Sequence, residues 1–90
     1  MIQKEVTIAN KDGLLARPAA LLVNVAGRYA SQVVIKQGSK NINAKSIMGV
    51  ISLGIARDEM VTIVVDGPDE QEAMDAIVRL IASNFEDIPE

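Results

Sequence analysis

Ser46 and Arg17 are the two residues of this sequence that point most directly to chemistry. Ser46 stands just before the apolar segment 47–53, where the N-cap of a short helix belongs, and a capping hydroxyl must lie near the surface. Phosphorylation there would add about −1.5 to −2 charges. The planar donor fork of Arg17 suits a phosphate or a partner carboxylate. The alternatives are a plain capping serine and a solvated arginine at the start of a helix.

The chain has no histidine and no cysteine, which removes most of the usual catalytic and metal-binding chemistry. A zinc site would need carboxylates alone, and no disulfide can form. We find no pairing of a nucleophile with a base. We therefore predict that the protein is not an enzyme and that it holds no metal and no cofactor.

Charge and hydropathy narrow the classes of partner. The net charge of −3 argues against direct nucleic-acid binding. No apolar run approaches the ~18 residues of a membrane span, and the first residues show no signal-peptide pattern. We expect no membrane insertion and a cytoplasmic location.

The hydrophobic periodicity predicts the elements that position these residues. Alternation indicates strands over 2–9, 32–37, 40–43 and 60–66, with Val61, Ile63 and Val65 on one face of the last. Apolar residues at helical spacing indicate helices over 16–27, 47–53 and 69–83. The side chains expected to pack on one face of the sheet are Ala19, Leu22, Val23, Ala26, Ala73, Ile77, Leu80 and Ile81.

Residues 1–90 are expected to form a single domain with a frayed tail from about residue 84. The order β-α-β-β-α-β-α suggests an antiparallel sheet with helices on one face. Periodicity alone leaves ferredoxin-like folds and regulatory amino-acid-binding folds open.

Two segments separate these folds. They read Gly13-Leu14-Leu15-Ala16-Arg17-Pro18-Ala19 and Asn43-Ala44-Lys45-Ser46-Ile47-Met48-Gly49-Val50. Together, in this order, they resemble the two signatures of the HPr family of the sugar phosphotransferase system. The resemblance implies an α+β open-faced β-sandwich, in which a four-stranded antiparallel sheet carries three helices on one face.

Leu15 occupies the position of the histidine that, in this family, takes a phosphoryl group from enzyme I and passes it to sugar transporters. Leucine has no lone pair, so the histidine relay loses its nucleophile. A relocated acceptor would have to be a carboxylate such as Asp12, which we disfavour. Natural members without the histidine exist, the Crh-type catabolite-repression proteins, and the chain is most similar to that type.

The resemblance also implies a regulatory role for Ser46. In the Gram-positive branch, a kinase of the HPr kinase/phosphorylase type modifies this serine, and the phosphorylated protein binds a catabolite repressor of the LacI/GalR type as a corepressor. A helix N-terminus tolerates such an anion. The residues that we predict to contact partners are Leu15, Arg17, Ala20, Leu21, Ile47, Met48 and Ile51.

The segment 47–53 is too apolar to be buried on all sides. Its five large apolar residues span about 220° of the helix, wider than the stripe a surface helix buries. Some of Ile47, Met48 and Ile51 should therefore be exposed and could dock a partner. Leu15 could extend that patch or fold inward. Lys40 and Lys45 are assigned only a weak role beside the serine.

Other functions remain open from the sequence. The protein could be a phosphocarrier whose acceptor histidine was lost or mutated, binding enzyme I without productive transfer. A small acylphosphatase-like enzyme fits poorly, because the nucleophile and base are missing. A ligand-binding regulatory domain is the remaining alternative, although such domains usually act within enzymes or oligomers.

Overall fold

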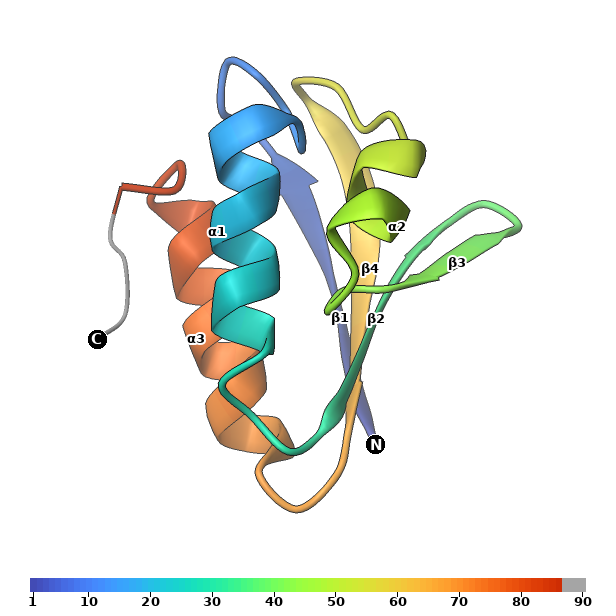
Figure 1. Cartoon of the computed structure of the whole chain (residues 1–90), viewed down its shortest axis with the longest axis vertical. Coiled ribbons are helices and arrows are strands. Elements are labelled where there is room, and N and C mark those ends of the chain that lie inside the picture. Colours follow the sequence, from blue (N-terminus) through green and yellow to red (C-terminus); the bar gives the residue numbers. More distant parts are fainter. Residues whose placement is uncertain (87–90) are drawn as a thin grey trace.

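The computed structural model describes residues 1–86 as a four-stranded sheet and three helices (Figure 1). Every predicted element is present, and each predicted end lies within one residue of the observed one. The strands and helices are β1 (Ile2–Ile8), α1 (Ala16–Ala26), β2 (Gln32–Gln37), β3 (Lys40–Asn43), α2 (Ile47–Ser52), β4 (Glu59–Asp66) and α3 (Glu70–Ala82).

The sheet has the strand order β1-β4-β2-β3, and all three pairings are antiparallel. Val33 of β2 pairs with Val65 of β4, and Ile35 pairs with Ile63, so their apolar side chains share one face. The predicted face of β4 is confirmed, because Val61, Ile63 and Val65 are all buried. The three helices lie on one side of the sheet and leave its other side open (Figure 1). The predicted open-faced β-sandwich is therefore confirmed.

Apolar stripes on α1 and α3 meet the sheet and one another. The α3 stripe is buried as predicted, and Ala19, Leu22 and Ala26 are buried on α1. The prediction for Val23 is only partly right, because Val23 is half-buried and Val25 lies in the core. At 100° per residue, Val23 falls at the edge of a stripe that α1 turns toward both the sheet and α3. The residues 9–15 and 84–86 then close the ends of these helices.

Phe85 departs from the expected fraying of the tail. The chain turns back after α3, with positive φ at Asn84 and Phe85, and the Phe85 N–H donates to the Leu80 carbonyl over 2.9 Å. The ring is only 3% exposed. The expectation is wrong for residues 84–86, because burying a large aromatic ring outweighs the polarity of its neighbours. The rest of the tail that was expected to fray, residues 87–90, lies outside the described residues.

Two long-range connections hold the loops that carry the site. The Leu14 N–H donates to the Ile55 carbonyl over 3.0 Å, joining the loop before α1 to the loop before β4. Gly13 makes this approach possible, because a Cβ there would collide with the Ile55 carbonyl oxygen, and its φ is +62°. At the opposite end of α1, the Asp69 carboxylate accepts hydrogen bonds from the Ala30 and Ser31 N–H groups, each 2.9 Å long.

The Ser31 hydroxyl also donates to Asp69 and, with these N–H groups, lowers the pKa of that carboxyl. Asp69 is the N-cap residue of α3. It makes no side-chain cap there and instead ties α3 to the segment that leaves α1. The sheet and both ends of α1 are thereby fixed relative to one another.

Candidate functional site

Ser46 lies in the turn between β3 and α2, and its side chain is exposed. Its backbone is extended, with φ −108° and ψ 115°, and its Oγ accepts a hydrogen bond from the Gly49 N–H over 3.2 Å. The predicted N-cap is therefore confirmed. The hydroxyl hydrogen has no acceptor among residues 1–86, so it can point toward solvent. The arrangement leaves Oγ accessible to an incoming phosphoryl donor.

The helix that Ser46 begins is six residues long and is held mainly by the side chains it buries. Val50 and Leu53 are in the core, so one side of this apolar segment is buried. Ile47, Met48 and Ile51 are exposed, and Met48 is exposed to 74%. The predicted exposure is confirmed for all three, and it places apolar side chains within one to five residues of the Ser46 hydroxyl.

Leu15 points outward at the start of α1. It is 44% exposed, whereas Leu14 beside it is fully buried. Leu15 is the N-cap residue and makes no side-chain cap, and Ala16 after it has φ +52°. A left-handed conformation costs a residue with a side chain about 1–2 kcal/mol. The sharp turn resolves the choice left open by the sequence, because Leu15 joins the exposed residues rather than the core.

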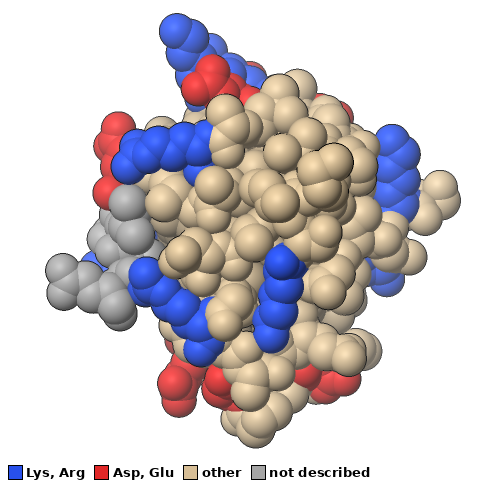
Figure 2. Space-filling model, viewed as in Figure 1, with Lys and Arg blue, Asp and Glu red and all other residues tan. Residues whose placement is uncertain are grey.

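Arg17, Ala20 and Leu21 lie on the first two turns of α1, and α1 packs beside α2. Arg17 and Ala20 are exposed, and Leu21 is half-buried. The fold thus gathers the seven predicted contact residues on two neighbouring helices and at the N-cap of α1. From the helix side, the surface shows a broad and mostly uncharged area, with some Lys and Arg side chains within and around it and acidic side chains mainly at its margins (Figure 2). We call these seven residues and Ser46 the docking surface.

The two lysines assigned weakly to the serine make no described hydrogen bond with it. Lys45 donates from Nζ to the Tyr29 carbonyl over 2.7 Å, so it ties the β3–α2 turn to the end of α1. Lys40 begins β3, at the opposite end of that strand from Ser46. The local sequence could not reveal the long-range partner of Lys45. The geometry provides no support for either lysine as a neutralising neighbour of Ser46.

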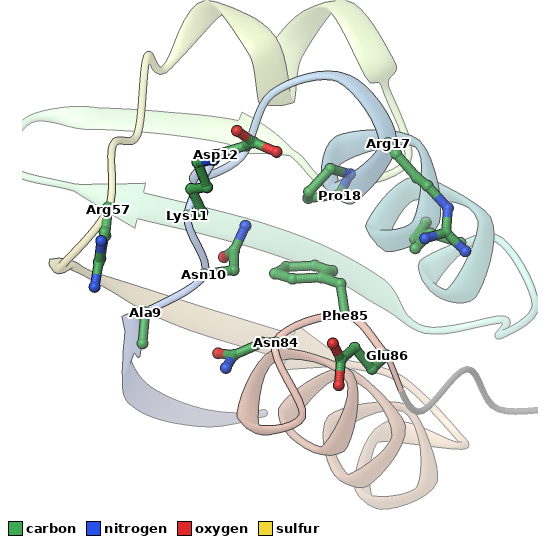
Figure 3. Close-up of a pocket in the computed structure, with 11 residues that line it drawn as sticks. Ala9, Asn10, Lys11, Asp12, Arg17, Pro18, Arg57, Asn84, Phe85 and Glu86 are labelled. Atoms are coloured by element: carbon green, nitrogen blue, oxygen red, sulfur yellow. The ribbon is translucent and has the colours of Figure 1, made fainter.

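A depression of about 500 Å³ borders the docking surface at Arg17. Asn10, Lys11 and Arg57 line it together with Arg17, and sequence reasoning missed these three residues (Figure 3). Only Gly13, which lets the loops before α1 and β4 meet, hinted that Arg57 would come close.

Residues 1–86 contain no helix that combines the length and apolar character of a membrane span. Within the same range, no three side chains of the metal-binding types come together. The polar chemistry of the described surface therefore rests on hydroxyl, amide, carboxylate and basic groups.

Comparison with known proteins identifies the fold and the motifs together. The family model described as the PTS HPr component phosphorylation site matches residues 2–83. The chain is 49% identical to the phosphocarrier protein HPr of Cupriavidus necator over 94% of this chain and 96% of that protein. It is 47% identical to the HPr-like protein Crh of Halalkalibacterium halodurans over 90% and 96%.

A crystal structure of HPr from Thermoanaerobacter tengcongensis superposes with a TM-score of 0.94 at 45% identity, covering 97% of this chain and 98% of that one. The relatives thus include both a protein named as a phosphocarrier and one named as HPr-like. The family is one of phosphocarrier proteins rather than catalysts. With its matching sheet, helices and motifs, the chain belongs to the HPr family.

Proposed function

We propose that this protein is a regulatory HPr-like protein that acts, once phosphorylated on Ser46, as a corepressor in carbon catabolite repression. The observation that carries the proposal is the pairing of an exposed leucine at position 15 with an exposed serine at position 46. Leu15 cannot accept a phosphoryl group, whereas Ser46 has a hydroxyl that can be phosphorylated. The similarity to a protein named HPr-like protein Crh supports the same assignment.

The chemistry at position 15 disfavours a carrier role. A phosphoryl group needs a nucleophile with a lone pair, and the Leu15 side chain offers only carbon and hydrogen. The chain has no other histidine to replace it. Enzyme I could still touch this surface, but no productive transfer would follow.

Phosphorylation of Ser46 is chemically straightforward in this geometry. A kinase of the HPr kinase/phosphorylase type would supply ATP and a base. The Ser46 Oγ attacks the γ-phosphorus, its proton goes to the base, and the bond to ADP breaks. The added phosphate sits at the start of α2, where backbone N–H groups favour an anion. Because Val50 and Leu53 anchor α2 in the core, the fold should survive the modification.

Repressor binding then uses two kinds of contact. The phosphate meets cationic groups of a LacI/GalR-type repressor through charge-assisted hydrogen bonds. Met48, Ile47, Ile51 and Leu15 supply apolar area that loses its water on docking. Arg17 offers a bidentate contact to a partner carboxylate, and Ala20 and Leu21 let the partner approach α1 closely. The protein itself catalyses nothing and works in the cytoplasm beside the kinase and the repressor.

The proposal is tested by calorimetric titration of the phosphorylated and unmodified proteins into a LacI/GalR-type repressor from the source organism. The phosphorylated form should bind at least tenfold more tightly, and Ser46→Ala should abolish the difference. Met48→Ala should weaken binding while phosphorylation continues. Met60→Ala is the matched control, because Met60 is also exposed but lies in β4, away from both helices. Equal affinity of the two forms would remove the switch.

A second experiment tests the lost relay. Incubation with enzyme I and labelled phosphoenolpyruvate should leave the protein unlabelled. Leu15→His should restore some labelling, because Arg17, Pro18 and the start of α1 are in place. Label on the unmodified protein would contradict our reading of Leu15, and label on Asp12 in particular would revive a relocated acceptor.

A further inference from the structure

The depression beside the docking surface is built from three separate parts of the chain. The loop after β1 supplies Asn10, Lys11 and Asp12, α1 supplies Arg17, and the loop before β4 supplies Arg57. The turn after α3 closes the remaining side (Figure 3). Its volume of about 500 Å³ lies in the range of small-molecule sites.

The charges that line the depression are mostly positive, although the chain carries a net −3. Lys11, Arg17 and Arg57 face two carboxylates, Asp12 and Glu86. Among the described residues, the ion pair of Arg57 is an exposed one with Asp58 at 3.9 Å, and Lys11 and Arg17 have none. Exposed pairs of this kind are weak. The basic groups are thus available to an anion, with Arg17 and Arg57 at opposite ends of the depression (Figure 3).

Asn10 gives an independent indication that something belongs in this depression. Its side chain is only 8% exposed, and its Oδ1 is buried without a hydrogen-bond partner among residues 1–86. The orientation of the amide is set, because Nδ2 donates to the Gly13 carbonyl over 2.8 Å. Flipping the amide would place two oxygens against each other. A buried acceptor left without a donor is costly, so an occupant that brings a donor to Oδ1 would be favoured.

We propose that this depression binds a small hydroxylated organic anion, of which a phosphate monoester is the best match. The anionic group is held by Arg57 and Lys11, and a second polar end reaches Arg17. Its hydroxyl is assigned to Asn10 Oδ1, the acceptor in the wall that lacks a donor among residues 1–86. The half-buried Pro18 and Leu21 cover the carbon skeleton. This site is separate from the corepressor proposal, because it shares only Arg17 and Leu21 with the docking surface.

The test is a titration of the unmodified protein, followed by amide and side-chain NMR signals, with glycerol 3-phosphate as the probe. Shifts should concentrate at Asn10, Lys11, Arg17 and Arg57. Inorganic phosphate lacks the carbon skeleton and its alcohol hydroxyls, and glycerol lacks the anion, so each should bind at least several-fold more weakly. No repressor or kinase is present, so the result is independent of the proposed function.

Arg57→Gln should weaken glycerol 3-phosphate binding about tenfold, as expected for the loss of one charge-assisted contact. Lys36→Gln is the matched control, because Lys36 is an exposed cation of β2 outside the depression. Asn10→Asp, checked for an intact spectrum, should also weaken binding by adding a negative charge at the wall. The proposal is overturned if no signal near the depression moves, if inorganic phosphate binds as well, or if Arg57→Gln and Lys36→Gln behave alike.

Discussion

Replacing Ser46 by alanine separates the structural role of the serine from its regulatory one. The substitution removes the hydrogen bond that Oγ accepts from the Gly49 N–H. Loss of an N-cap costs about 0.5–2 kcal/mol. The 3.2 Å length and the exposure of Ser46 place this cap in the lower half of that range. We therefore expect a loss of about 0.5–1 kcal/mol in the free energy of unfolding.

In a domain of this size, that loss lowers the melting temperature by about 2–8 °C. Thermal unfolding followed by circular dichroism measures it directly. Ser39→Ala is the matched control, because Ser39 is exposed in the β2–β3 turn and makes no described side-chain hydrogen bond. Its effect should stay within about 0.5 kcal/mol.

Ser46→Asp completes the series, since aspartate caps as well as serine and adds negative charge at the start of α2. Its stability should return to at least that of the unmodified protein. If Ser46→Ala melts at the same temperature as Ser39→Ala, the cap contributes nothing. The short helix would then depend on Val50 and Leu53 alone.

Three further perturbations probe the framework of the site. Ile77→Ala empties a fully buried position and should cost roughly 2–5 kcal/mol in denaturant unfolding; a loss below about 0.5 kcal/mol would contradict the burial of α3. Gly13→Ala puts a Cβ against the Ile55 carbonyl and should cost more than the ~1–2 kcal/mol of a left-handed alanine; an unchanged melting temperature would contradict the close approach of the two loops. Hydrogen bonds from Ser31 and Ala30 lower the pKa of Asp69, so its contribution is present above the unfolded value of about 3.9 and is lost as the pH falls through the lower folded value. Asp69→Asn should therefore flatten the acid limb of stability against pH, and an unchanged limb would show that other carboxylates set it.

Local sequence patterns and composition were enough to predict the elements of the fold and to exclude histidine chemistry. Strand and helix ends follow from local alternation and helical spacing, which depend on residues only a few positions apart. The missing histidine needs no structure at all. The cap at Ser46 was also predictable, because an N-cap is a local interaction between the serine and the third residue after it.

Contacts between distant residues were decided only by the tertiary structure. Asp69 bonds to the Ala30 N–H across 39 positions, and Lys45 bonds to the Tyr29 carbonyl across 16. Phe85 enters the core although its neighbours are polar. Periodicity cannot report such contacts, because it shows which face of an element is buried but not what lies against it.

The direction of Leu15 and the surroundings of Asn10 depend on the path of the chain in the same way. Leu14 and Leu15 are identical in type, yet only the anchoring of Leu14 at Ile55 decides which is buried. Asn10 and Arg57 line one depression because that same contact brings two loops together. The residues of the docking surface could thus be named from the sequence motifs and the family resemblance that they carry, whereas the neighbouring pocket required the packing of segments that are far apart in the chain.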